Sequence, residues 1–316
     1  MIIIRQNISQ SRIFHRKNLY IIIGEVRVLS NVTLTIENGT KIYLMNGKMR
    51  SSLIFNTGSI LVAKTFSVQA CNDKFKPVKK ANNGGLWFLG SSTNAEKDDI
   101  SVKVSPKTSS FTAQHINVLY LGRSDPKSGD DKPNTDDIDG ISILGVGCNE
   151  WKICEIVSIG SGDDGFDVEN SSITLQCLSI INPKEDGLNI TSSRVNIIRS
   201  LFVKMVKSNV KDRDIFDLET DDGPSYVRMA KGCHVNISGF FGDQLELISL
   251  DLPQPKGDSV YYKYDGTSSK GQSYVYSGIL QSIEIPPTFL QSAKKKSVDI
   301  INSIRKTLNH KFGNYW

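Results

Sequence analysis

The chain has 316 residues, of which 39% are hydrophobic, and a formal net charge of +5. It contains no run of 18 or more apolar residues, so the sequence predicts no membrane-spanning helix. The positive charge alone would suggest nucleic acid as a partner, but residues 130–222 carry 19 acidic and 9 basic side chains. A surface that follows a phosphate backbone would not be interrupted by so acidic a segment, which excludes nucleic-acid binding there.

The N-terminus shows no secretory signal, because the apolar stretch from Met1 to Ile4 is too short and Arg5 interrupts it. Localisation therefore stays open between the cytoplasm, export by another route, and secretion with a leader that this sequence lacks. The five cysteines include no CxxC pair, so neither a zinc site nor a disulfide framework is expected. We expect them to be small buried side chains.

The start of the chain, up to Ser30, is expected to form an N-terminal cap, and strand-like segments follow at regular spacing. Residues 32–44 alternate apolar and polar side chains around an Asn-Gly turn, and residues 53–62 repeat this pattern around a second glycine turn. The interval between the two turn glycines, Gly39 and Gly58, predicts one coil of a solenoid. Residues 85–89 predict a further inward-facing strand.

A short phrase then recurs down the middle of the chain: an aspartate, usually a glycine, and alternating apolar and polar residues. It begins at Asp139, Asp164 and Asp186, and in a looser form at Asp214. The intervals between these aspartates fall within the period of about 20–50 residues that is typical of stacked repeats, in which no unit buries its apolar face alone. Asp-Gly favours a turn and the alternation favours a strand, so the sequence predicts an all-β parallel β-helix with the aspartates in one column.

Three polar stretches interrupt this rhythm, at residues 74–83, 91–99 and 124–133. In a solenoid such insertions emerge from the turns and often wall a binding groove. Past residue 250 the pattern loosens, and the aromatic alternation at residues 260–264 and 274–276 predicts edge strands that pack across the body.

These coils resemble right-handed parallel β-helix proteins of the pectate-lyase-like class. The resemblance rests on the segment from Thr33 to Thr40 and on Gly85-Leu86-Trp87-Phe88, and as a pattern of coils it covers residues 20–250. It implies a right-handed solenoid. It does not imply one activity, because the same scaffold carries hydrolases, lyases, epimerases, adhesins and phage tail proteins.

Near the C-terminus the apolar period changes from that of a strand to that of a helix. Val298, Ile301, Ile304 and Leu308 lie on one helical face, and basic residues occupy much of the remainder. An exposed solenoid end must be covered, so we expect a capping helix, with docking on a membrane or partner as the alternative. The predicted organisation is a β-helix with its N-terminal cap (residues 1–285) followed by a C-terminal basic amphipathic helix (residues 286–316).

The aspartate column has a chemical and a structural interpretation. Adjacent coils of a parallel sheet lie ~4.8 Å apart, and two carboxylates at that distance repel, which raises one pKa unless a cation or hydrogen bonds intervene. Glycoside hydrolysis uses such a pair, a protonated acid beside an ionised partner. In the structural interpretation each aspartate caps the backbone just ahead of its strand.

Two motifs in this region resemble those of the polygalacturonase family of inverting glycoside hydrolases: Asn134-Thr135-Asp136 and, about one coil later, Gly162-Asp163-Asp164. The resemblance implies that Asp163 or Asp164 is the general acid and that Asp136 activates water together with the other aspartate. The family's Gly-His-Gly is replaced by Lys184-Glu185-Asp186-Gly187. Its Arg-Ile-Lys has a loose counterpart in Arg228-Met229-Ala230-Lys231.

The sequence therefore predicts a carbohydrate-active protein that hydrolyses a polysaccharide or oligosaccharide, without a required cofactor. The predicted catalytic residues are Asp136, Asp163 and Asp164. The predicted substrate-binding residues are Asp139, Glu185, Asp186, Arg228 and Lys231. Trp151, in a turn near the column, is a candidate for stacking on a sugar ring. The oligomeric state is not predicted.

Two alternatives stay open. One is a non-catalytic structural or adhesive β-helix. The other is a polysaccharide lyase, in which calcium neutralises a uronate and the base is Lys184, Lys211 or Arg213. Calcium would find oxygen ligands in a second column on the same sheet, formed by Asp167, Asn189 and Asp217 with Glu169 and Glu219 beside it.

Overall fold

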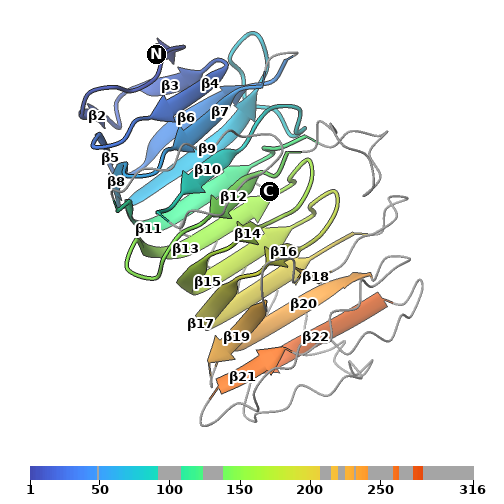
Figure 1. Ribbon diagram of the computed structural model, residues 1–316. Coiled ribbons are helices and arrows are strands. Elements are labelled where there is room, and N and C mark those ends of the chain that lie inside the picture. Colours follow the sequence, from blue (N-terminus) through green and yellow to red (C-terminus); the bar gives the residue numbers. More distant parts are fainter. Residues whose placement is uncertain are drawn as a thin grey trace.

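The computed structural model describes residues 1–47, 50–91, 108–123, 138–206, 215–219, 225–230, 233–240, 259–262 and 273–279, the backbone alone for residues 235–240, 259–262 and 273–279. The described residues form an all-β structure with two sheets (Figure 1). The seven-stranded sheet contains β4 (Glu25–Val28), β7 (Ser52–Phe55), β10 (Leu86–Leu89), β12 (Ile141–Leu144), β14 (Asp167–Glu169), β16 (Leu188–Thr191) and β18 (Phe216–Glu219).

The fifteen-stranded sheet contains the remaining strands. They are β1 (Ile2–Ile4), β2 (Arg12–Phe14), β3 (Leu19–Ile22), β5 (Thr33–Ile36), β6 (Thr40–Met45), β8 (Ile60–Ala63), β9 (Thr65–Cys71), β11 (Ser110–Leu119), β13 (Trp151–Ile159), β15 (Ser172–Ile181), β17 (Arg194–Lys204), β19 (Tyr226–Ala230), β20 (His234–Phe240), β21 (Ser259–Tyr262) and β22 (Ser273–Ile279).

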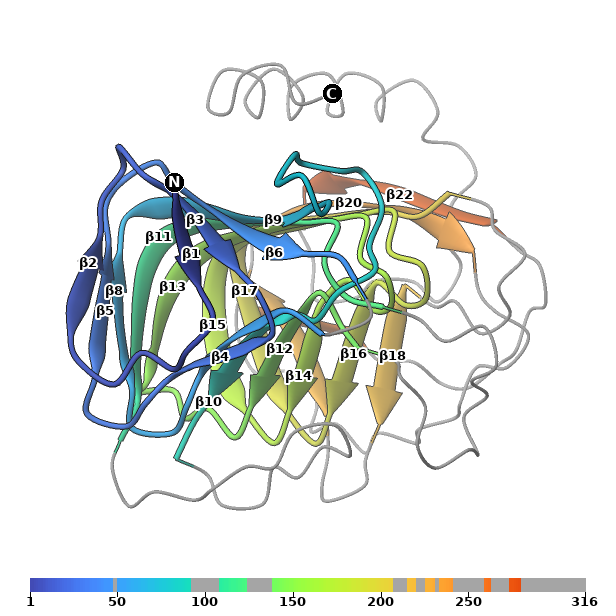
Figure 2. The ribbon, with the colours of Figure 1, turned by 90° about the horizontal axis from the view of Figure 1, so that it is seen from above.

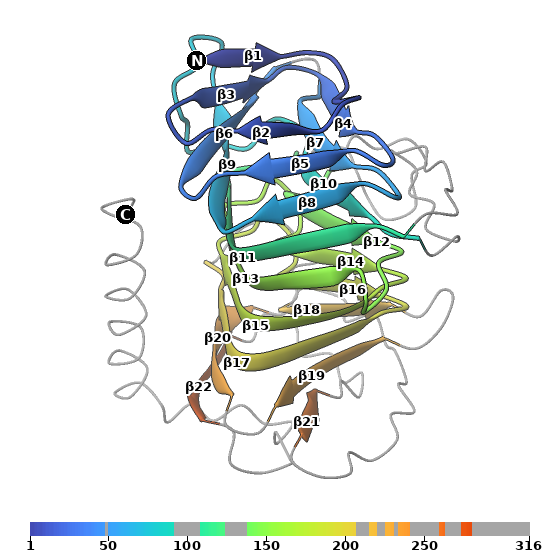
Figure 3. The ribbon, with the colours of Figure 1, turned by 90° about the vertical axis from the view of Figure 1, so that its left-hand side faces the viewer.

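The chain winds from one sheet to the other and back, so that each coil adds strands to both. Strands from successive coils pair in parallel, as β11 does with β13 and β13 with β15, and they stack in order down the molecule (Figure 3). Seen from above, the larger sheet bends around the core and the seven-stranded sheet closes the open side (Figure 2). This arrangement confirms the predicted parallel β-solenoid.

The far end of the larger sheet departs from the parallel pattern. There β21 pairs with β19 and β22 pairs with β20, both antiparallel. These two strands confirm the edge strands predicted from the aromatic alternation. The predicted C-terminal helix, residues 286–316, lies outside the described residues.

The two-residue period of the strands separates an apolar inner row from a mixed outer row. On the seven-stranded sheet the inner residues Phe88, Ile143, Val168 and Ile190 are in register and fully buried in the main core. The aromatic rings of Phe55 and Phe88 stack face to face, with their centroids 5.3 Å apart. Packing of this kind between coils supplies the apolar burial that no single coil can achieve.

Trp151 belongs to this core, and its predicted role as a sugar platform is wrong. Its side chain is 5% exposed, and its ring meets Phe88 edge to face with 5.5 Å between centroids. The prediction that all the cysteines are buried holds for Cys71 and Cys233, whereas Cys148 and Cys154 are exposed. None of the five cysteines forms a disulfide.

Side chains complete the hydrogen bonding between coils at the turns, where no partner strand is available. At one turn the backbone N–H of Val146 donates to Ser171 Oγ (2.8 Å), and the N–H of Ser171 donates to Ser193 Oγ (2.9 Å). The N–H of Ser193 in turn donates to Ser225 Oγ (3.3 Å). Because an unpaired buried N–H is costly, these serines hold successive coils in register.

Glu150 performs the same function at the base of an insertion. Its buried carboxylate accepts hydrogen bonds from the backbone N–H groups of Ser109 (2.7 Å) and Gly147 (2.8 Å), and from that of Ser91 (3.2 Å). Ser91 and Ser109 lie on either side of residues 92–107. One carboxylate therefore ties together the two ends of this insertion.

We expect Glu150→Gln to lower the free energy of unfolding by about 1–3 kcal/mol, because the amide NH2 would face backbone donors. The measurement is urea denaturation followed by circular dichroism. Glu25→Gln, at an exposed glutamate, is the matched control and should change the stability by less than about 0.5 kcal/mol. Equal unfolding midpoints for the wild type and Glu150→Gln would contradict this role.

Candidate functional site

The structure aligns three of the predicted aspartates across successive coils. Ser142, Asp167 and Asn189 are register partners in β12, β14 and β16. Asp139, Asp164 and Asp186 each precede one of these partners by three residues, so they occupy equivalent turn positions. We call these three residues the aspartate column. Asp214, the fourth predicted member, lies outside the described residues.

The glycines that follow Asp164 and Asp186 are required by the close approach of the coils. A Cβ atom at Gly165 would lie 2.7 Å from the carbonyl oxygen of Gly187, and one at Gly187 would lie 2.6 Å from the carbonyl oxygen of Ile215. Real Cβ atoms do not come so near to backbone. The Asp-Gly phrase therefore marks the point where consecutive turns touch, and not merely a flexible turn.

Asp164 links its own coil to the next one. Its Oδ1 accepts a hydrogen bond from the backbone N–H of Asp186 (2.9 Å), and its Oδ2 accepts one from Asn189 Nδ2 (3.1 Å). Burial raises the pKa of Asp164 well above its usual value, and the negative charges of Asp139 and Glu185 raise it further, while the two hydrogen bonds lower it in part. Asp164 therefore keeps its proton to a higher pH than an ordinary aspartate does.

Asp139 and Asp163 are also buried, with 5% and 7% of their surfaces exposed. Asp139 Oδ2 accepts a hydrogen bond from Ser142 Oγ at 3.1 Å. The backbone carbonyl of Asp163 accepts from the N–H of Lys184 (3.2 Å), which connects two successive turns. Asp139, Asp163 and Asp164 therefore lie in the turns that lead into the neighbouring strands β12 and β14 of the seven-stranded sheet.

The remaining predicted residues fall in different places. Glu185 and Asp186 are half-buried in the turn before β16, beside Asp164. Arg228 lies in β19 of the fifteen-stranded sheet, opposite Asn196, and is not brought to the aspartate column by strand pairing. Asp136 and Lys231 lie outside the described residues.

The second predicted column is in register on the face of the seven-stranded sheet opposite the main core, and its member Asp167 is buried. Asp167 pairs with Asn189, and Asn189 with Asp217. Beside them Thr191 Oγ1 donates to Glu219 Oε2 at 2.6 Å. Within the part of the chain that the structure describes, no group of three or more His, Cys, Asp or Glu side chains is placed to hold a metal ion. The calcium site stays a prediction.

A cavity of about 520 Å³ lies beside the turn that leads into Asp163. Its lining residues include the turn of residues 160–162 and four basic residues, Lys79, Lys80, Arg123 and Lys184. We call this cavity the basic pocket. No acidic residue is among its described lining residues.

Hydrogen bonds to neighbouring coils hold the loop that carries the two adjacent lysines. Asn46 Nδ2 donates to the carbonyl of Lys80 (2.9 Å), and Asn83 Nδ2 donates to Asn46 Oδ1 (2.6 Å). The N–H of Gly122 donates to Asn83 Oδ1 (3.2 Å), which brings the segment before Arg123 against the same loop. The basic pocket is therefore built from turns of several coils.

Sequence reasoning did not identify this pocket, although one signal pointed towards it. Residues 74–83 interrupt the coil rhythm and are rich in lysine, and such insertions often wall a groove. Lys184 was considered only as the base of a lyase. That Lys79, Lys80, Arg123 and Lys184 line one cavity depends on the stacking of coils, which the sequence does not display.

Comparison with protein-family models, with curated proteins and with solved structures found no match for this chain. No helix in the described ranges has the length and hydropathy needed to cross a membrane. The function must therefore be inferred from the geometry of the chain itself.

The elevated pKa of Asp164 predicts a pH-dependent contribution to stability. Its folded-state pKa lies above the usual value of 3.8, so the folded chain holds this proton more tightly than the unfolded chain does. The contribution is fully present below that value and is lost as the pH rises through the folded-state pKa. We expect the stability of the wild type relative to Asp164→Asn to fall as the pH rises from the usual pKa of 3.8 through the higher folded-state pKa of Asp164.

Urea midpoints measured at several pH values for both proteins provide the check. Asp73→Asn, at an exposed aspartate, serves as the matched control and should reproduce the wild-type profile. A difference between the wild type and Asp164→Asn that is constant with pH, or that grows as the pH rises, would refute the assignment.

Proposed function

We propose that the protein binds an acidic polysaccharide at the basic pocket and hydrolyses it with carboxyl groups of the adjoining turn. The observation that carries this proposal is the position of the pocket. Gly162 lines it, and the next two residues along the chain are Asp163 and Asp164. Cations for binding and carboxyl groups for catalysis are thus neighbours.

The charge of the pocket favours a ligand that carries carboxylate, sulfate or phosphate groups. Lys79 and Lys80 are exposed and would act as point charges, and Arg123 contributes a planar guanidinium of the shape that pairs with such groups. A neutral glycan could accept hydrogen bonds from these groups but would not gain the attraction between opposite charges. The substrate class is therefore an acidic glycan, and the polygalacturonase-like motif around Asp163 is consistent with one.

Hydrolysis needs a proton donor and a base, and the turn contains candidates for both. Asp164, whose pKa is raised, would donate its proton to the glycosidic oxygen as the C–O bond breaks. Asp163, in its ionised form, would accept a proton from a water molecule whose oxygen bonds to the anomeric carbon. Transfer of that proton back to Asp164 through solvent restores the enzyme.

The same proposal includes the resemblance to pectate-lyase-like solenoids and to polygalacturonases. A right-handed, pectate-lyase-like solenoid with a polygalacturonase-like site would add Asp136 as a third carboxyl group for activating water. Lys184 of the basic pocket would be the base if the protein were a lyase. The two reactions differ in their products, because a lyase leaves an unsaturated sugar that absorbs ultraviolet light.

One observation favours a second candidate function, that of a non-catalytic scaffold. Both carboxyl oxygens of Asp164 accept hydrogen bonds from the following coil. This is what a coil cap does in a solenoid without activity. In that case the aspartate column would stabilise the stack, and the basic pocket would bind an acidic ligand without cleaving it.

The test is an assay for new reducing ends on a panel of acidic polysaccharides, namely polygalacturonate, alginate and a sulfated galactan. We expect Asp163→Asn to lower kcat by about 10²–10⁴-fold, because a general acid–base group contributes about that much. We expect Lys79→Ala/Lys80→Ala to raise KM with little change in kcat, since the two lysines would bind the substrate and its transition state alike.

Thermal unfolding of each variant separates lost activity from lost folding. If the wild type releases no reducing ends and no ultraviolet-absorbing products, but still binds one of these polysaccharides, the scaffold interpretation replaces the hydrolase. Cleavage by Asp163→Asn at the wild-type rate would remove the catalytic assignment of that residue.

A further inference from the structure

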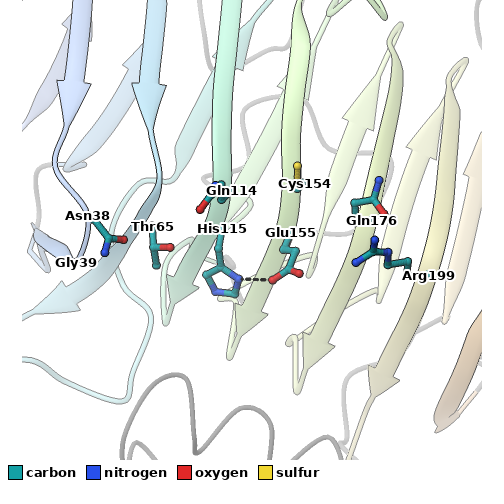
Figure 4. A pocket seen from close by; sticks show the side chains of 9 residues that line it. All are labelled: Asn38, Gly39, Thr65, Gln114, His115, Cys154, Glu155, Gln176 and Arg199. Carbon is teal, nitrogen blue, oxygen red and sulfur yellow. Dashed lines mark hydrogen bonds and ion pairs between the residues drawn. The ribbon is translucent and has the colours of Figure 1, made fainter.

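A second cavity, of about 700 Å³, lies on the other sheet and takes no part in the proposed reaction (Figure 4). It follows the bend of the fifteen-stranded sheet. At this bend β11 changes partner, pairing with β8 through its first residues and with β9 through its later ones. We call this cavity the bend groove.

The bend groove runs along the solenoid and not along a strand. Thr65 is the register partner of His115, and His115 is the partner of Glu155. Gln176 on β15 and Arg199 on β17 continue the line. They directly precede Cys177 and Ser200, which are register partners of each other. The line extends from the turn before β6 to β17, five steps of ~4.8 Å, so the groove is ~24 Å long.

The chemistry of the lining is polar and close to electrically neutral. The amides of Gln114 and Gln176 each offer both donors and an acceptor, and Arg199 adds a planar donor. Glu155 supplies the one carboxylate among the described lining residues, which balances that guanidinium. The groove therefore lacks the strong positive charge that distinguishes the basic pocket.

A hydrogen-bonded chain orients the centre of the groove. His115 Nδ1 lies 3.0 Å from Glu155 Oε2, and His115 Nε2 lies 3.0 Å from Asn117 Oδ1. The His115 side chain is only 7% exposed and positions the Glu155 carboxylate, whereas Gln114 and Arg199 are exposed. Side chains held in this way lose little freedom when a ligand binds.

These features point to one class of ligand. A hydroxyl group both donates and accepts hydrogen bonds, so a line of amide, carboxylate and guanidinium groups suits a chain with many hydroxyls. An extended peptide would bind by adding a strand to an open edge, but β11, β13 and β15 each have a partner strand on both sides. We propose that the bend groove is a second binding site, specific for a neutral, hydroxyl-rich glycan chain.

The test is affinity electrophoresis of the full chain, under reducing conditions because Cys154 also lines the groove. The gels contain soluble starch, mixed-linkage β-glucan, galactomannan or xylan. We expect at least one of these to retard the wild type. Gln114→Ala/Gln176→Ala should weaken that binding about tenfold, which corresponds to about 1.4 kcal/mol, because two amide contacts are lost.

Gln6→Ala/Gln10→Ala, which removes two exposed glutamines outside the groove, is the matched control and should bind like the wild type. Lys79→Ala/Lys80→Ala should also keep its affinity for the neutral glycan. This variant changes the basic pocket and not the bend groove. Binding of a neutral glycan can therefore be tested even if the proposed hydrolysis proves wrong.

Three results would overturn the proposal. In the first, none of the four neutral polysaccharides retards the wild type. In the second, the groove variant is retarded as strongly as the wild type, with thermal unfolding showing that both are folded. In the third, neutral-glycan binding is lost in the basic-pocket variant and kept in the groove variant, which would assign all binding to the basic pocket.

Discussion

Hydrogen bonding between consecutive coils is the constraint on which the rest of this structure depends. Within the strands the backbone satisfies itself by parallel pairing, but at the turns it has no partner strand. Serine hydroxyls take over at one turn, as in the chain from Ser171 to Ser193, and carboxyl groups do so elsewhere, as at Glu150 and Asp164. A buried N–H left without a partner costs about 1–3 kcal/mol, so polar side chains are needed at fixed points of every coil.

This constraint also explains where ligand-binding chemistry can arise. The carboxyl group of Asp164 holds the next coil, and its burial raises its pKa, which is the property that acid catalysis requires. Lys79 and Lys80 are exposed and Arg123 is half-buried, and all three lie where the loops of several coils converge. The bend groove also depends on stacking, because stacking places His115 beside Glu155 although the two residues are far apart in sequence. In both places regular winding turns distant residues into neighbours.

The fold could be predicted from the sequence because its signals are local. The Asp-Gly phrase and the two-residue alternation at Gly165-Phe166-Asp167-Val168 reflect coil contacts and inward packing, and both recur once per coil. The candidate sites could not be predicted in full, because their members come from different coils. Trp151 was misjudged because its neighbour in sequence, Glu150, suggested a turn, whereas Phe88 and Phe111 pack around its ring. Arg228 was predicted to bind substrate because it matches part of the Arg-Ile-Lys motif, but it lies in the fifteen-stranded sheet and not beside the aspartate column.

Disulfide trapping across the outer face of the seven-stranded sheet tests the central claim, the register of consecutive coils, most directly. Asn189 and Asp217 are register partners on strands of consecutive coils, at a spacing that a disulfide can bridge. In Asn189→Cys/Asp217→Cys, mild oxidation should link these two positions, as shown by mass spectrometry of the joined peptides. Asn189→Cys/Glu219→Cys, shifted by two residues along β18, should not form the link. Equal linkage in both variants, or linkage in the shifted one alone, would contradict the stacking described here.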